Sequence, residues 1–191
     1  MDHVRRAVLD QGLDHIRAAS AERGRLELIV RRPAPGVREV VDRAELHLVD
    51  GLVGDNWRER GARDTADGGA HPGRQVTLMS TRVAALIAGP VARWPLAGDQ
   101  LYVDLDLSEA ALPPGTRLGV GTAVLELTGE PHRGCAKFVE RFGVDAGRFV
   151  NTGETQRLRL RGVNARVAVP GILRVGDEVV RLTTATATTD G

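Results

Sequence analysis

The chain has 191 residues, of which 42% are hydrophobic, so it has enough apolar material for one folded domain. Lys and Arg total 26 and Asp and Glu total 25, which gives a formal charge of +1 and no basic excess of the kind that nucleic-acid-binding proteins show. No apolar run approaches the roughly 18 residues that a membrane span needs, and an N-terminus with Asp2 and Asp10 does not resemble a signal peptide. We therefore expect a cytoplasmic protein that binds neither nucleic acid nor membrane.

Hydrophobic periodicity predicts a series of short elements in chain order. Helices are expected at 3–22, where Gly12 weakens the pattern, at 80–88 with Ser80 as the cap, and at 135–142, closed by Gly143. Strands are expected at 25–30, 37–49, 75–79, 101–107, 118–127, 157–169 and 172–182. A bulge at Gly121 is expected to bend the strand at 118–127. Residues 51–74 have no period and form a long loop, of a kind that is usually functional or mobile.

Short strands, glycine bends and few helices together predict a mainly β fold, either a barrel or a sandwich. A parallel doubly wound sheet is excluded because most of the predicted strands have no helix between them. The chain then divides into an N-terminal helical extension (1–24), a β domain (25–182) and a disordered polar tail (183–191).

The only cysteine, Cys135, lies in the segment that is richest in chemistry, GEPHRGCAKFVERFG, residues 129–143. Pro131 and Gly134 predict a turn before Cys135, which then opens a helix whose N-terminus carries partial positive charge. Further polar side chains surround it in the sequence: His132, Arg133, Lys137 and Arg141. These surroundings favour a thiolate, and a thiolate is suited to act as a nucleophile, a sulfur carrier or a soft-metal ligand.

A structural role for Cys135 is an equal alternative on position and charge alone. With Phe138 and Phe142 it falls on one face of the predicted helix, and buried cysteines are common in protein cores. A single cysteine excludes an internal disulfide and a cysteine-built zinc site, and the G-x-S-x-G, G-x-x-x-x-G-K-[ST] and H-E-x-x-H motifs are absent. Lys137 is the only lysine, so a Schiff base with pyridoxal phosphate could form only there. An exposed helical lysine is more typical of a solvated charge.

The histidines give weaker signals. His71 lies in the long loop beside Arg74, where it can approach a site, although a solvated loop histidine is the more common case. His3, His15 and His47 are typical of surface positions. Arg and Asp residues within GLVGDNWRERGARD could bind an anion bidentately, but a charged loop in solvent is again the more common case.

Taken in order, several segments resemble the MOSC domain, a family named for the C-terminal domain of molybdenum cofactor sulfurases. The resemblance extends from about residue 25 to residue 182. The segments are IVRRPAPGVREVV, GLVGDNW, HPGRQVTLMS, PLAGDQLYVDLDLSEAALPPGTRLGVGTAVLELT, PHRGCAKFVERFG and RGVNARVAVPGILRVGD. GLVGDNW is similar to the family's G-x-x-GD element, and PHRGCAKFVERFG is the most specific of the matches.

The resemblance implies a mainly antiparallel β-barrel with Cys135 as the functional cysteine. In family members that are reductases, the matching thiolate binds molybdenum in the pterin cofactor. The other role proposed in the family is to carry sulfur as a persulfide. Many relatives have P-C-x-x-C, and His132 stands at the first cysteine position here, so the resemblance does not extend to a two-thiol mechanism. The matching motifs also imply that Arg74, Gln75 and Asp99 are pocket residues.

Three functional hypotheses follow. The first is a molybdenum-cofactor protein that reduces N-hydroxylated bases or related small N–O compounds. In this hypothesis Cys135 ligates the metal, and Arg133, Lys137 and Arg141 contact the cofactor's phosphate or favour the thiolate. The sequence contains no iron–sulfur or flavin module, so a separate protein would donate the electrons. The second is a sulfur carrier in which Cys135 holds a persulfide supplied by a cysteine desulfurase. The third is a non-catalytic binding domain in which Cys135 is buried.

Overall fold

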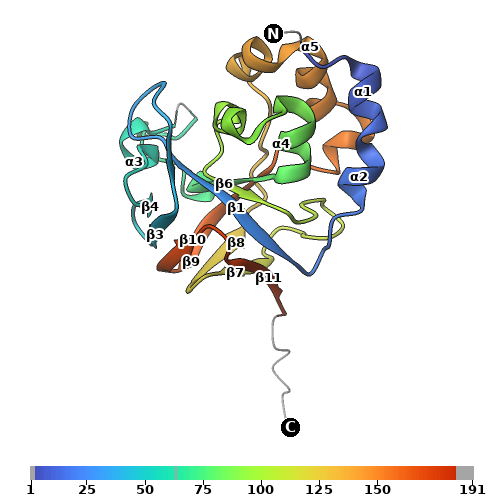
Figure 1. Cartoon of the computed structure of the whole chain (residues 1–191). Helices are drawn as coiled ribbons and strands as arrows, with labels where there is room; N and C mark the ends of the chain where they lie inside the picture. Colours follow the sequence, from blue (N-terminus) through green and yellow to red (C-terminus); the bar gives the residue numbers. More distant parts are fainter. Residues whose placement is uncertain (1–2, 63, 184–191) are drawn as a thin grey trace.

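The computed structural model describes residues 3–62 and 64–183 of the chain (Figure 1). Its α-helices are α1 (Arg6–Gln11), α2 (Leu13–Arg17), α3 (Trp57–Arg60), α4 (Thr81–Ala88) and α5 (Ala136–Asn151). Short 3-10 helices are η1 (Pro72–Arg74), η2 (Val91–Ala97) and η3 (Gly153–Gln156). Its strands are β1 (Arg23–Arg31), β2 (Glu39–Val41), β3 (Arg43–His47), β4 (Gly51–Leu52), β5 (Val76–Ser80), β6 (Leu101–Val103), β7 (Arg117–Val120), β8 (Ala123–Leu127), β9 (Val163–Val169), β10 (Gly171–Arg174) and β11 (Glu178–Leu182).

Seven of these strands close into a barrel in the order β1, β11, β7, β8, β9, β5 and β6, with β6 returning to β1. Neighbouring strands are antiparallel except β5 and β6, which are parallel. A parallel pair needs a crossover connection, and α4 with η2 provides it. β2 extends the sheet beyond β1, while β10, β3 and β4 form a second, three-stranded sheet. The predicted mainly antiparallel β-barrel is confirmed.

Alternating side chains fill the barrel. In β8, Ala123, Leu125 and Leu127 are buried and the residues between them are half-buried, a period of two that points one face inward. A second apolar core lies between the outside of the barrel and the helices α1, α4 and α5, which gather on one side of the molecule (Figure 1). Its largest members include Leu9, Tyr102, Phe138, Phe142 and Phe149. Among the residues that the structure describes, no helix is long and apolar enough to cross a membrane.

α5 is bent at Gly143, which has φ 91° and ψ 166°. A Cβ at this position would lie 2.8 Å from atoms of His3, so both the backbone conformation and the close approach require glycine. Beyond the bend, the carboxylate of Asp145 accepts a hydrogen bond from the backbone N–H of Arg6 at 2.9 Å, which ties α1 to α5. Gly143 ends the first helical segment, as predicted, but a second helical segment that was not predicted follows the bend and continues to Asn151.

The predicted strand at 118–127 is a hairpin of two strands, β7 and β8, and the bulge predicted at Gly121 is wrong. Gly121 has φ 57° and makes the turn between the two strands. Predicted strands are also too long elsewhere, because alternating side chains continue beyond the ladder hydrogen bonds. The strand at 101–107 ends at Val103, the segment 157–162 forms turns before β9, and the stretch at 37–49 is divided into β2 and β3.

The predicted N-terminal helix is divided at Gly12 into α1 and α2. A Cβ at Gly12 would lie 2.5 Å from Leu86 of α4, so the helices approach most closely at this residue. The predicted loop at 51–74 contains β4, α3 and η1. Ser80 precedes α4 as expected, but its hydroxyl makes no capping hydrogen bond. Residues 184–191 of the predicted tail lie outside the described residues, and the separation of 1–24 from the barrel domain stays a prediction.

Candidate functional site

Cys135 is the N-cap residue of α5, and its side chain is exposed. The hypothesis that it is buried in the core is therefore wrong. The turn before it is fixed from the far end of the same helix by Asn151. The Asn151 amide accepts a hydrogen bond from Gly134 N–H at 2.9 Å and donates one to the Gly134 carbonyl at 3.1 Å. One side chain thus holds the backbone of the residue that precedes the thiol.

Cys135 lines a cavity of about 540 Å³, whose other walls come from residues 32–38 after β1, from α3 and from the segment before β6. The cavity is strongly basic. Its positively charged lining residues are Arg32, Arg38, Arg60, Arg74, Arg133, Lys137, Arg141 and Arg161. No carboxylate is among the described residues that line it. A cavity with this lining attracts anions, because its low-dielectric walls focus a field of one sign.

Arg32 is buried in one wall by a bidentate ion pair with Asp55. Its Nε and Nη2 donate to the two Asp55 carboxylate oxygens at 2.8 and 2.9 Å, and its Nη1 donates to the Gly98 carbonyl at 2.8 Å. The Asp55 carboxylate also accepts the backbone N–H groups of Arg32 and Trp57. These bonds satisfy both charges, so the pair joins the end of β1 to the start of α3.

Arg161 forms the corresponding pair in a second wall. Its Nη1 donates to Asp99 at 2.5 Å and its Nη2 to the Ala97 carbonyl at 2.8 Å. Its guanidinium carbon lies 5.1 Å from the centre of the Phe138 ring, in the first turn of α5. Asp99 is fully buried, and this pair therefore connects the segment before β6 to α5.

His132 lies against this buried pair and lines the cavity three residues before the cysteine. Its Nδ1 is 3.5 Å from the second oxygen of Asp99, too far for a well-formed hydrogen bond, and neither atom has another partner. Burial, reinforced by the positive charge of Arg161, lowers the pKa of His132 to about 3 against the opposing effect of Asp99. Because Asp99 is already neutralised by Arg161, the imidazole is neutral near pH 7.

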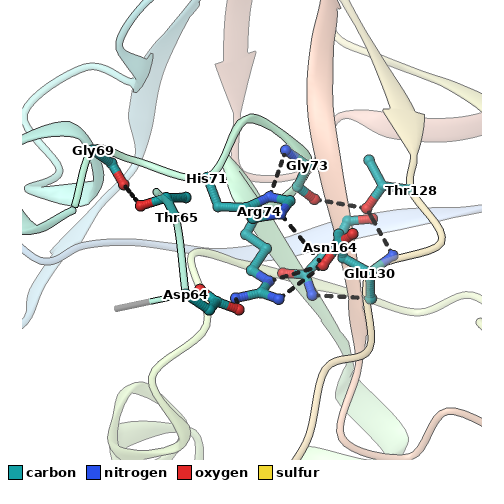
Figure 2. Close-up of polar contacts among 9 residues, drawn as sticks. All are labelled: Asp64, Thr65, Gly69, His71, Gly73, Arg74, Thr128, Glu130 and Asn164. Carbon is teal, nitrogen blue, oxygen red and sulfur yellow. Dashed lines mark hydrogen bonds and ion pairs between the residues drawn. The ribbon is translucent and has the colours of Figure 1, made fainter. Parts of the chain in front are cut away.

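Arg74 is held by two carboxylates at the edge of the cavity (Figure 2). Its Nε and Nη2 donate to Glu130 at 3.1 and 2.8 Å, and its Nη1 donates to Asp64 at 2.7 Å, a hydrogen bond that lowers the pKa of Asp64. The Nδ1 of His71 accepts the N–H of Gly73, while its Nε2 lies 3.7 Å from Glu130. The network ties the long loop to the segment that leads to Cys135, and its two carboxylates more than balance the positive charge of Arg74.

The remaining basic residues of the cavity form no ion pair with any carboxylate in the described part of the chain. They are Arg38, Arg60, Arg133, Lys137 and Arg141. Desolvation, followed by the charges of Arg141 and Arg32, lowers the pKa of Arg38. Desolvation and the charges of Arg32 and Arg38 likewise lower the pKa of Arg60, although Asp55 opposes the shift. These effects on the pKa indicate that Arg38 lies near Arg141 and Arg32, and that Arg60 lies near Arg32 and Arg38.

Most of the site residues expected from the sequence come together in this cavity: Arg74, His132, Arg133, Cys135, Lys137 and Arg141. Three do not line it. Asp99 lies behind the wall in its pair with Arg161. Gln75 is buried, and its amide bonds the Leu48 carbonyl and the Val167 N–H, a structural role. His71 contacts the Arg74 network instead.

Three basic cavity residues, Arg32, Arg38 and Arg161, were not predicted from the sequence, and Arg60 was considered only as part of the charged loop GLVGDNWRERGARD. They come from segments far from Cys135, and nearly all basic residues of this chain are arginines, so a single Arg carries little signal. The RRP and GDNW segments within the family-like motifs contain Arg32 and Asp55, and their opposite charges were the one available hint of a pair. Among the described residues, no group of three or more His, Cys, Asp or Glu side chains is arranged to hold a metal ion.

A mixed, seven-stranded barrel with an exposed thiol in a basic cavity is the class of protein that these observations define. The family model of the MOSC domain matches residues 55–180. The chain belongs to the MOSC domain family.

Solved structures show the same fold. The YuaD protein from Bacillus subtilis is 21% identical, with 85% of this chain and 97% of that chain covered and a TM-score of 0.59. YiiM from Escherichia coli is 18% identical, with 84% of this chain and 71% of that chain covered and a TM-score of 0.54. No curated protein matches the sequence. At these identities the likeness shows the fold alone, and the function has to be argued from the site.

Proposed function

We propose that this MOSC protein is a cytoplasmic reductase that binds the molybdenum cofactor through the Cys135 thiolate and reduces N-hydroxylated bases or related N–O compounds. The observation that carries the proposal is the placement of the chain's single thiol. It is exposed, it opens a helix, and it lines a basic cavity whose volume of about 540 Å³ suits a ligand larger than an inorganic ion.

The residues present fit the cofactor. A thiolate is a soft ligand, of the type that a metal in a sulfur-rich environment accepts. The protein offers no second metal ligand of this kind, and the pterin cofactor would bring its own sulfur atoms to the metal. Arg133 and Lys137, two residues before and two after the cysteine, are unpaired and suited to the negative charge of a thiolate and of the cofactor's phosphate.

Reduction of an N–OH group breaks the N–O bond, consumes two electrons and two protons, and releases an amine and water. When bound, the molybdenum cofactor supplies the redox chemistry. The chain's own residues bind the cofactor and the substrate and orient them. Asn151 fixes the turn before Cys135, and the Arg161–Asp99 pair holds the wall beside it. The neutral imidazole of His132 can donate one hydrogen bond and accept another, so it can help to orient a bound ligand within the cavity.

The proposal includes a separate electron-donor protein. Within the 191 residues a single cysteine is too few to ligate an iron–sulfur cluster. The exposed position of Cys135 is compatible with such a partner approaching the open side of the cavity.

An assay with benzamidoxime and a chemically reduced viologen dye tests this proposal. Protein from a host that makes the molybdenum cofactor should reduce the amidoxime to benzamidine, and the Cys135→Ser variant should not. Arg58→Gln is the control, because Arg58 pairs with Asp50 at 2.6 Å and does not line the cavity. Equal activity of the wild type and Cys135→Ser would contradict the proposal.

A sulfur-carrier function is the second candidate, and the exposed, unpaired Cys135 favours it as well. In this case a cysteine desulfurase transfers its sulfane sulfur to the Cys135 thiolate and forms a persulfide on it. Cyanide would then release thiocyanate from the wild type after incubation with the desulfurase and free cysteine, but not from Cys135→Ala. No cyanide-labile sulfur in the wild type would exclude this function.

A further inference from the structure

The cavity contains more basic residues than the proposed function requires. Arg38 and Arg60 are the two that have no role in it. Neither side chain forms an ion pair with a described residue, and Arg38 Nε is buried without a partner. The one hydrogen bond that Arg38 donates goes to the carbonyl of its neighbour Val37, at 2.6 Å. Arginine keeps its proton in proteins, so both positive charges are available to an anion that enters the cavity.

A charge count shows how much is left over. Five basic residues of the cavity have no carboxylate partner, namely Arg38, Arg60, Arg133, Lys137 and Arg141. A Cys135 thiolate brings one negative charge and a cofactor phosphate roughly two more, since a phosphate monoester carries about −1.5 to −2 near neutral pH. Roughly two positive charges remain after both are bound, which is the charge of one more phosphate-like group.

The basic residues of the cavity come from different segments of the chain. Arg133 and Lys137 flank Cys135 in the sequence, whereas Arg38 comes from the segment after β1 and Arg60 from the end of α3. Asn56, the N-cap residue of α3, lines the same part of the cavity, and its Oδ1 is buried without a partner. That oxygen is an acceptor and does not bind an anion, so the wall formed by residues 32–38 and α3 presents two cations, Arg38 and Arg60.

We propose that Arg38 and Arg60 bind a phosphate-like dianion that the substrate itself carries. This inference rests on the proposed function and narrows its substrate class to N-oxygenated compounds with their own phosphate or phosphonate group. The dianion anchors the substrate at the wall formed by residues 32–38 and α3, and the N–O group extends toward Cys135. A pair of guanidinium groups suits such an anion because each presents several N–H donors in a fixed plane.

A matched pair of substrates tests the proposal: benzamidoxime and its 4-phosphonomethyl derivative, which differ only in the dianion. For the wild type, KM for the phosphonate should be lower by at least about tenfold, the size expected for charge-assisted hydrogen bonds. The double variant Arg38→Gln/Arg60→Gln should raise this KM by about tenfold or more and leave KM for benzamidoxime nearly unchanged. Arg58→Gln, on the same helix but outside the cavity, should change neither value. Equal KM values for the two wild-type substrates would overturn the proposal.

A binding measurement separates failure of this inference from failure of the proposed function. Titration of the purified holoprotein with benzylphosphonate, followed by calorimetry, requires no turnover. Binding that is lost in Arg38→Gln/Arg60→Gln but kept in Arg58→Gln supports the anion site even if no amidoxime is reduced. Absence of binding overturns it. A second phosphate could also come from a nucleotide form of the cofactor, and mass analysis of the released cofactor tests this alternative. A nucleotide form that is retained by the wild type but lost from Arg38→Gln/Arg60→Gln would also overturn the proposal.

Discussion

Two buried ion pairs, Arg32–Asp55 and Arg161–Asp99, determine which positive charges of the cavity are available to a ligand. In each pair the carboxylate is almost or fully inaccessible to solvent. Burying a charge is costly unless it is paired, so each pair is a unit whose halves depend on each other. The arginines of these pairs hold the wall together, whereas Arg38, Arg60, Arg133 and Arg141 have no carboxylate partner among the described residues and can bind a ligand.

The Asp99→Ala variant is predicted to be strongly destabilised, because it leaves Arg161 charged and buried without its partner. Removing one half of a buried pair costs about 3–5 kcal/mol of unfolding free energy. Urea unfolding measures this cost, with Asp10→Ala as the control. Asp10 pairs with Arg6 on the exposed face of α1, where the loss should be below about 1 kcal/mol. Similar losses in the two variants would mean that the Asp99 pair does not stabilise the wall.

His132 gives the protein a predicted dependence on pH. Burial lowers the pKa of His132 to about 3 in the folded protein, from an ordinary value of 6.5, so the unfolded chain binds the proton more readily. The stability that follows from the neutral imidazole is fully present above about pH 6.5 and is lost as the pH falls toward 3. Between pH 6.5 and 5 the loss is about 2 kcal/mol.

The measurement is urea unfolding of the wild type and His132→Gln at pH 7 and pH 5. The variant lacks the titrating group, so the difference in stability between the two proteins should shrink by about 2 kcal/mol on acidification. A difference that is the same at both pH values would show that His132 titrates alike in the folded and unfolded chain.

At the scale of elements, α5 links the thiol to the N-terminal helices, and its bend at Gly143 sets the direction of the second half. A Cβ at Gly143 would meet His3 at 2.8 Å, and the φ of 91° is one that only glycine adopts readily. Gly89, at the end of α4, also has positive φ, but nothing lies within 4 Å of its Cβ position.

Gly143→Ala is therefore predicted to be more destabilising than Gly89→Ala. Backbone strain costs each variant about 1–3 kcal/mol, and the collision with His3 adds to the cost at Gly143 alone. Thermal unfolding of the two variants makes the comparison. An equal decrease in Tm would show that the close approach of His3 to Gly143 adds nothing to the cost of the substitution.

The turn before Cys135 depends on Asn151 at the other end of α5. Asn151→Ala removes both hydrogen bonds to Gly134 and should cost about 1–2 kcal/mol of stability. Hydrogen exchange at the Gly134 amide is the specific readout, and it should become faster in the variant while exchange in β8 stays unchanged. Unchanged protection of Gly134 would contradict this role for Asn151.

How much could be predicted from the sequence differs between local and distant contacts. The alternating pattern predicts the inward face of β8, because a strand's period is a local property. The bend of α5 could not be predicted in this way. Gly143 normally ends a helix, and only the packing of the N-terminal segment against it, a contact between distant residues, explains why the helix resumes.

At the scale of the whole molecule, the barrel brings six separate segments together around one cavity. The local motif places Arg133, Cys135, Lys137 and Arg141 in it, since they lie within two turns of one helix start. Arg32, Arg38, Arg60 and Arg161 arrive only through the barrel topology and through loops whose path the sequence does not specify. The chemistry at the thiol was therefore predictable, whereas the charge that these four arginines add to the cavity was not.

The molybdenum content of the purified protein tests the central claim, that Cys135 holds the cofactor, most directly. Wild type, Cys135→Ser and Arg58→Gln are expressed in a host that makes the molybdenum cofactor, and metal per chain is determined by mass spectrometry. The account predicts near-stoichiometric molybdenum in wild type and Arg58→Gln and a large loss in Cys135→Ser. Negligible metal in all three, or equal loading of wild type and Cys135→Ser, would contradict it.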